Sequence, residues 1–175
     1  PPLTLEIQAT TGWNDTAMGF LTTLPVLVMG LAALIVPAPA QRIGRPQTVW
    51  IALALLVVAS GARVAADIPG VLFVTAFLGG LGIALASGLV PAIVREDLPR
   101  STGAATGLWT ASMFTGAALA AALTVPVAIA TGSWQWGLAV WALPAIAALV
   151  LWTIVESPYR RHASDRSVGE ISIRS

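Results

Sequence analysis

The sequence predicts an all-α fold, a polytopic bundle of five transmembrane helices. Of the 175 residues, 57% are hydrophobic and only 10% are charged, whereas about 25% of residues are charged in soluble domains. Four stretches contain no charged residue, namely residues 16–41, 46–62, 68–94 and 101–155. A spanning helix needs roughly 20 apolar residues, because it rises about 1.5 Å per residue across a hydrocarbon core about 30 Å thick. The stretches therefore supply five spans, the longest stretch supplying two.

The first predicted span covers residues 16–41 and follows an outer segment, residues 1–15. The polar side chains of residues 14–16 can accept hydrogen bonds from the unpaired amides of the first helical turn. The uncharged stretch is longer than one crossing requires. Pro37 and Pro39 are expected to end the helix before the stretch ends, because proline lacks the amide donor that a helix interior needs.

The second and third spans are predicted at residues 48–66 and 71–94. The second is long enough only if Arg63 lies in its last turn, where a long arginine side chain can extend its charged head to the membrane surface. In the third span, Pro91 is expected to kink the helix near its end.

The last uncharged stretch is too long for a single helix. Its strongest turn signal is the Thr-Gly-Ser sequence at residues 131–133, since glycine followed by serine is typical of turns. We therefore predict two spans, at residues 101–130 and 134–155. Pro126 and Pro144 are expected to kink or locally unwind these helices, which a bundle tolerates because neighbouring helices satisfy the freed carbonyl groups.

The distribution of arginine predicts the orientation of the bundle. If successive loops alternate between the two sides, then Arg42, Arg45, Arg95 and Arg100 lie on the same side as the arginines of residues 156–175. The positive-inside rule makes this side cytoplasmic, so the N-terminus lies outside and the last 20 residues form a cytoplasmic tail without fixed structure. An outside N-terminus without a signal peptide, together with an odd number of spans, predicts a further helix upstream.

The residue types present argue against enzymatic, metal-binding and nucleic-acid functions. The chain has no cysteine, its one histidine is His162 in the predicted tail, and no Asp or Glu lies well inside a predicted span. Neither a general base nor a metal site can be assembled within the bilayer from these residues, so we predict a non-enzyme without metal or cofactor. The sequence has no phosphate-binding loop for ATP, and its arginines do not form the basic face that binds nucleic acid.

Arg63 is the only charged residue that falls within a predicted span. An ionisable group at membrane depth is a candidate site for an anionic substrate. Two other interpretations stay open: the side chain anchors the helix at the membrane surface, or it pairs inside the bundle with Asp67, which follows at the i+4 spacing of a helical ion pair.

Other candidate residues are uncharged. Trp109 and Met113 are spaced i, i+4, so they lie on the same face of a helix. Two interpretations stay open: the two side chains form one wall of a cavity, or they pack against the core or lipid. Thr22 and Ser87 are hydroxyls available inside spans, although most such hydroxyls bond to a carbonyl one turn earlier. Residues 103–107 form a Gly-x-x-x-Gly motif that lets helices approach closely, either in ordinary bundle packing or in a mobile helix pair.

The loop after the first span resembles a known signature. Residues 37–46 read Pro-Ala-Pro-Ala-Gln-Arg-Ile-Gly-Arg-Pro. Arg42, Gly44 and Arg45 match the cytoplasmic loop motif of the major facilitator superfamily, Gly-x-x-x-Asp-Arg/Lys-x-Gly-Arg/Lys-Arg/Lys, while its first glycine, its aspartate and its last basic position differ. Residues 24–27, 86–99, 106–110 and 134–136 are similar to the cyanate and nitroimidazole transporter branch of that family.

The resemblance implies that the chain is the N-terminal half of a carrier without its first helix. The five spans would then be helices two to six of a six-helix half. Residues 156–175 would be the cytoplasmic tail or the linker between the two halves. By analogy, the first, third and fourth spans would face a cavity between the halves. This arrangement makes Thr22, Ser87, Trp109 and Met113 better candidates for substrate contact than Arg63.

Our leading hypothesis is the N-terminal portion of a secondary active transporter for a small polar or anionic organic solute, working by alternating access in a bacterial inner membrane. Its expected partners are the lipid bilayer, the solute, and either the missing half or further copies of the chain. The isolated portion is expected to be inactive. The alternative is a non-transporting structural or assembly subunit that packs against partner helices through its glycine and alanine faces.

Overall fold

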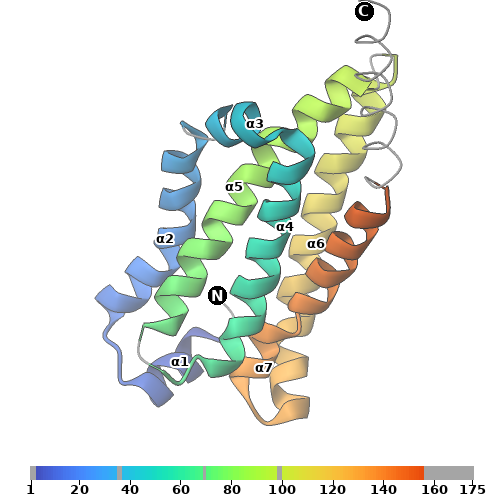
Figure 1. Cartoon of the computed structure of the whole chain (residues 1–175). Helices are drawn as coiled ribbons and strands as arrows, with labels where there is room; N and C mark the ends of the chain where they lie inside the picture. Colours follow the sequence, from blue (N-terminus) through green and yellow to red (C-terminus); the bar gives the residue numbers. More distant parts are fainter. Residues whose placement is uncertain (1–2, 35–36, 69, 98–99, 156–175) are drawn as a thin grey trace, which may run out of the picture.

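In the computed structural model of the chain, every regular element among residues 3–34, 37–68, 70–97 and 100–155, which are the residues described, is helical (Figure 1). The elements are α1 (Thr4–Thr11), α2 (Asp15–Ala33), α3 (Pro37–Ile43), α4 (Arg45–Gly61), the 3₁₀ helix η1 (Ala62–Ala65), α5 (Val71–Asp97), α6 (Thr102–Thr131), α7 (Trp134–Ala139) and a last helix over residues 142–155. Five helical stretches, with α4 and η1 counted together and α7 joined to the last helix, are long and apolar enough to cross a membrane. The predicted all-α bundle of five spans is confirmed.

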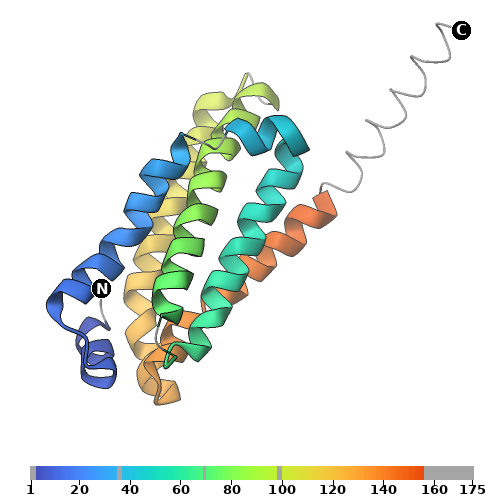
Figure 2. The ribbon, with the colours of Figure 1, turned by 60° about the vertical axis from the view of Figure 1, so that its left-hand side comes forward.

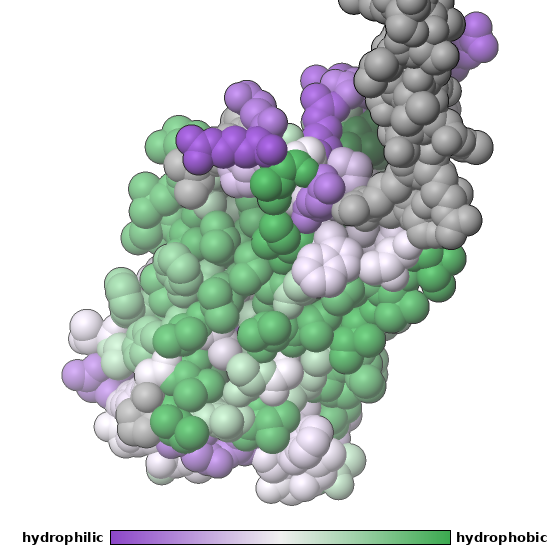
Figure 3. Space-filling model, in the orientation of Figure 1, coloured by the Kyte–Doolittle hydropathy of each residue, from purple (hydrophilic) through white to green (hydrophobic). Residues whose placement is uncertain are grey.

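The long helices run side by side along one axis (Figures 1 and 2). Helices α2 and α5 run in one direction, and α4 and α6 run in the other. We call the end that holds α3, the beginning of α4 and the end of α5 the arginine end, and the opposite end, with α1, η1 and α7, the α1 end. Figure 3 shows a broad hydrophobic belt, with hydrophilic side chains gathered towards the two ends. This is the distribution that a bilayer requires.

Helix α2 ends at Ala33, before the end of the uncharged stretch that reaches residue 41, in line with the early end expected from Pro37 and Pro39. Pro37 then opens a separate helix, α3, at the arginine end. Proline suits this position because its fixed φ angle matches the first turn of a helix and its missing amide donor is not needed there. The prolines of this segment thus separate two helices.

The boundary between α1 and α2 depends on Gly12 and Asn14. Gly12 has φ 68°, a left-handed conformation that favours glycine, and its amide closes α1 by donating to the carbonyl of Gln8 at 2.9 Å. The side chain of Asn14 then accepts from the amide of Ala17 at 2.9 Å and caps α2. Of the three capping side chains that the sequence predicted, Asn14 performs this function, while Asp15 is the first residue of the helix.

Helix α5 packs closely against both α2 and α4, and glycine makes each approach possible. A Cβ atom at Gly80 would lie 2.8 Å from the carbonyl oxygen of Pro25, and one at Gly82 would lie 2.9 Å from that of Ala52. Only glycine fits at such distances from a neighbouring backbone. Gly80 and Gly82 therefore allow α2 and α4 to pack against α5.

The last span is interrupted at Val140 and Trp141, between α7 and the helix over residues 142–155. Pro144 explains the break, because its ring would collide with the carbonyl of Val140, four residues earlier, in a continuous helix. The amide of Leu143 instead donates to that carbonyl at 3.0 Å. The local unwinding that the sequence predicted at Pro144 is confirmed, whereas α6 continues through Pro126.

The interruption brings Trp141 against α6. Its indole N–H donates to the hydroxyl oxygen of Thr124 at 2.9 Å, and the hydroxyl of Thr124 donates in turn to the carbonyl of Ala120 at 2.6 Å. A Cβ atom at Gly137 would lie 2.9 Å from the carbonyl oxygen of Thr124. Close backbone approach and a hydrogen bond between side chains therefore join the last span to α6.

We expect Thr124→Val to weaken this contact, because valine keeps the shape of threonine but cannot accept the hydrogen bond. Hydrogen bonds between transmembrane helices contribute on average about 0.6 kcal/mol and at most about 1.7 kcal/mol, so the free energy of unfolding in bicelles should fall by an amount in this range. Thr110→Val is the matched control, because Thr110 is exposed and bonds only to the carbonyl of Thr106. Equal losses in the two variants would contradict the assignment.

Candidate functional site

The loop signature lies at the arginine end, where α3 turns into α4. Gly44, the residue between these helices, has φ 89°, and a Cβ atom there would also meet the side-chain oxygen of Gln47 at 2.7 Å. An L-residue with a side chain would be strained at this φ. The glycine of the motif is thus required by the turn, while Arg42 is exposed in the last turn of α3.

Arg45, the second arginine of the motif, links this turn to another helix. Its guanidinium forms an ion pair with the carboxylate of Glu96 at the end of α5. The side chains are 42% and 61% exposed, respectively, so water screens the pair and its contribution to stability is small. Beside it, the indole N–H of Trp152 donates to the carbonyl of Pro46 at 3.2 Å. The motif therefore connects α4 with α5 and with the last span.

Arg63 lies at the other end of the bundle, in η1. Its side chain is half-buried, and among the described residues no ion pair joins it to Asp67. The carboxylate of Asp67 instead accepts a hydrogen bond from the side-chain amide of Gln135 in α7. Of the three interpretations left open for Arg63, pairing with Asp67 is not found among the described residues: η1 ends at Ala65, and Asp67 lies in the turn beyond it, so the two residues do not occupy one α-helical face.

The hydroxyl of Thr22 is occupied within its own helix. It donates to the carbonyl of Gly19 at 3.0 Å. Similarly, the hydroxyl of Ser112 donates to the carbonyl of Leu108 at 2.8 Å. The sequence predicted this bonding one turn back along the helix for most hydroxyls, and for these two it is confirmed. Thr22 remains exposed, so its hydroxyl oxygen can still accept a hydrogen bond from another molecule.

The four uncharged candidates divide into two groups by depth. Pro25 touches Gly80, and α2 and α5 run in the same direction. Counting about 1.5 Å per residue from this contact, Thr22 and Ser87 differ in depth by about 15 Å. Thr22 therefore does not share one site with Ser87.

Ser87, Trp109 and Met113 lie at comparable depth. Ser87 is about 15 Å from the last residue of α5 at the arginine end, and Trp109 and Met113 are about 10 and 16 Å from the first residue of α6 at the same end. Ser87 and Trp109 are half-buried, and Met113 is 48% exposed. These three residues, on two neighbouring helices, remain the candidate site predicted from the sequence.

Helix α6 exposes most of its length. Most described residues between Gly103 and Leu123 are exposed, including Leu108 at 70% and Phe114 at 73%. A Cβ atom at Gly103, Gly107 or Gly116 would have no neighbour within 4 Å. The Gly-x-x-x-Gly motif predicted to pack between helices is therefore uncovered in this structure, and α6 contacts α5 at few points. This open face adjoins the candidate site.

Several hydrogen bonds between side chains were not predicted from the sequence. Trp134, Trp141 and Gln135 had no assigned partner, yet Trp141 bonds to Thr124 and Gln135 bonds to Asp67. The one available signal was the presence of polar side chains beside the predicted turn, because indole and amide groups near a membrane surface usually find partners. Which partner each one takes depends on helix packing and could not be read from spacing.

Comparison with known proteins agrees with the fold and the loop signature. The Major Facilitator Superfamily profile matches residues 1–175. The chain is 32% identical to the Uncharacterized transporter YycB of Bacillus subtilis (strain 168), over 92% of this chain and 39% of that protein. No solved structure matches it at a significant level.

Two further relatives come from Escherichia coli (strain K12). The chain is 32% identical to the Cyanate transport protein CynX over 86% of this chain and 39% of that protein. It is 35% identical to the 2-nitroimidazole transporter over 86% of this chain and 38% of that protein. The chain thus spans about two fifths of the length of these relatives. Its five apolar helices, its loop signature and the match along its whole length show that it is an integral membrane protein of the major facilitator superfamily.

Proposed function

We propose that this chain is the N-terminal portion of a secondary active transporter that moves a small polar or anionic organic solute by alternating access. The observation that carries the proposal is the comparable depth of Ser87, Trp109 and Met113 on α5 and α6, beside an α6 face that the other described residues leave open. A hydroxyl, an indole and a thioether can bind a small, flat, polar solute through a hydrogen bond and aromatic contact.

The relatives support this chemical class. Cyanate and 2-nitroimidazole, the solutes that two relatives are named for, are both small and polar. A secondary transporter binds its solute near the bilayer midplane, between two repeats that rock against each other. In this proposal the open face of α6 meets the second half of the carrier. In isolation, we expect the same face to drive association between copies of the chain.

We further propose that the arginine end is cytoplasmic, in a bacterial inner membrane. Arg42, Arg45, Arg95 and Arg100 all lie at this end, and short cytoplasmic loops carry an excess of arginine and lysine. The N-terminal helix α1 would then face the outside. The ion pair between Arg45 and Glu96 would lie at the cytoplasmic surface, where its exposure to water is tolerated.

The test is solute uptake by the longer protein that contains this chain. We expect proteoliposomes of that protein to accumulate labelled cyanate or 2-nitroimidazole above empty liposomes when a proton or sodium gradient is imposed. Trp109→Ala should lower the uptake rate by about tenfold or more, because it removes an aromatic contact worth about 1–1.5 kcal/mol together with its buried area. Trp136→Ala, which removes an exposed tryptophan at the α1 end, is the matched control.

Two outcomes would contradict the proposal. If no gradient drives uptake of either solute or of related small anions, the non-transporting assembly subunit becomes the better explanation. If uptake occurs and falls equally in the Trp109 and Trp136 variants, the protein is a transporter whose solute binds elsewhere than at Trp109.

A further inference from the structure

A small polar pocket lies at the α1 end of the bundle, where the last turn of α1 and the link to α2 meet the turn after η1. It has a volume of about 210 Å³ and is lined by Thr10, Thr11, Trp13, Ala66 and Asp67. This volume admits a molecule of a few heavy atoms. The pocket is separate from the candidate solute site, because Ser87 lies about 24 Å along α5 from Val71, the first residue of that helix at the α1 end.

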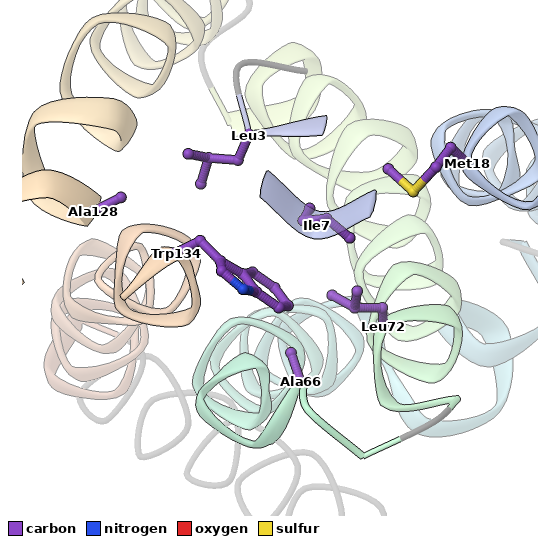
Figure 4. Close-up of a cluster of buried hydrophobic side chains, with 7 residues drawn as sticks. All are labelled: Leu3, Ile7, Met18, Ala66, Leu72, Ala128 and Trp134. Atoms are coloured by element: carbon purple, nitrogen blue, oxygen red, sulfur yellow. The ribbon is translucent and has the colours of Figure 1, made fainter. Parts of the chain in front are cut away.

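Packing of buried side chains holds the walls of this pocket in place. Figure 4 shows Ile7 of α1 in one buried cluster with Ala66, which itself lines the pocket, so α1 is fixed against the turn after η1. The ring of Trp13 packs against that of Phe73 in α5, with ring centroids 5.0 Å apart. The pocket is therefore formed without a ligand, as most small-molecule sites are.

The hydroxyl and carboxylate oxygens at the pocket wall are arranged to accept hydrogen bonds. The hydroxyls of Thr10 and Thr11 each donate to a backbone carbonyl four residues earlier, at 2.9 and 2.6 Å. With its proton engaged in this way, a hydroxyl oxygen offers a ligand its lone pairs. The carboxylate of Asp67 accepts a hydrogen bond from the side-chain amide of Gln135, and its two oxygens can accept more than one. These three side chains are suited to a ligand that donates hydrogen bonds.

The charges around the pocket favour a cation. Asp67 places a carboxylate at the wall, and Glu6 and Asp15 are exposed at the same end of the bundle. The last turn of α1, residues 8–11, contains no basic residue, so the partial negative charge at this helix end is not neutralised within the turn. Trp13 adds an aromatic ring, and tryptophan attracts cations more strongly than the other aromatic residues do.

We propose that this pocket binds a small primary ammonium ion, the protonated form of a short aliphatic amine. Its N–H groups donate to the carboxylate of Asp67 and to the hydroxyl oxygens of Thr10 and Thr11, and its charge is attracted by the ring of Trp13. Among the described residues that line the pocket, Asp67 is the one carboxylate, which matches a single positive charge. A quaternary ammonium ion fits less well, because it has no N–H group to donate. This proposal does not rest on the proposed function.

The indole N–H signal of Trp13 provides the test. The chain, labelled with ¹⁵N and purified in a maltoside detergent at neutral pH, is titrated with methylammonium chloride, while sodium chloride is lowered to keep the ionic strength constant. The signal of Trp13 is assigned with Trp13→Phe. We expect this signal to shift and to saturate, because the ligand lies against the indole ring. The signal of Trp152, which bonds to Pro46 at the arginine end, should stay in place as an internal control.

Two variants make the test specific. Asp67→Asn should raise the dissociation constant for methylammonium by about fivefold or more, because asparagine can still accept the bond from Gln135 but carries no charge. Asp15→Asn is the matched control: it removes an exposed carboxylate that bonds to Gln8 and is not among the residues lining the pocket, so the constant should rise by less than about twofold. Unchanged signals of the other tryptophans confirm that each variant is folded. The proposal is overturned if the Trp13 signal does not move, if the two variants weaken binding equally, or if potassium chloride or tetramethylammonium chloride produces the same saturating shift.

Discussion

Gly80→Ala is expected to lower the free energy of unfolding of the bundle by about 1–3 kcal/mol, the usual range for forcing an extra methyl group into a close-packed interface. The new Cβ atom would lie 2.8 Å from the carbonyl oxygen and 2.9 Å from the Cα atom of Pro25. Both are backbone atoms, so no side chain can rotate away and the two helices must separate. Separation would also uncover the contact with Val28, which is 5% exposed.

Gly116→Ala is the matched control for this effect. Gly116 is also inside a long helix, but nothing lies within 4 Å of its added Cβ atom. Alanine there should be neutral or stabilising by up to about 1 kcal/mol, because it favours a helix more than glycine does. Unfolding in bicelles, followed by circular dichroism, measures both variants. A Gly80→Ala variant as stable as Gly116→Ala would mean that α2 and α5 do not cross at Pro25 and Gly80.

Much of the fold follows from the sequence because the membrane allows few alternatives. A backbone in hydrocarbon must satisfy its own polar groups, so a long uncharged stretch has to be a helix. The charged residues that delimit the four uncharged stretches, together with the turn at residues 131–133, therefore predicted the number of spans. The short helices α1 and α3 escaped prediction, since both lie at the membrane surface, where this constraint is absent.

The candidate site was less predictable because it depends on rotation and depth. Analogy with the carrier family placed Thr22 and Ser87 in one group, but the crossing of α2 and α5 separates them by about 15 Å in depth. The i+4 spacing of Arg63 and Asp67 suggested a pair only on the assumption of an α-helix, whereas the chain forms a short 3₁₀ segment that ends at Ala65 and leaves Asp67 in the following turn. Such local changes of helix type leave no clear signal in composition.

The largest functional effect is expected from the chain taken alone: proteoliposomes containing only these 175 residues should take up no more solute than empty liposomes. The chain spans about two fifths of the length of its relatives, and α6 leaves Leu108 and Phe114 more than two thirds exposed. A solute bound beside this open face would have only one wall, so neither side of the membrane could be closed off from it.

Supplying the remainder of the longer protein as a separate chain should restore uptake, provided that it covers α6. Phe114→Arg would test this requirement, because a charge on a face that must be buried costs several kcal/mol and should block the rescue. Leu5→Arg is the control, since Leu5 is exposed in α1 and lies outside the five spans. Uptake by the isolated chain, driven by a gradient and abolished by Trp109→Ala, would contradict this expectation. It would mean that copies of the chain complete the cavity for one another, with the open face of α6 as the contact between them.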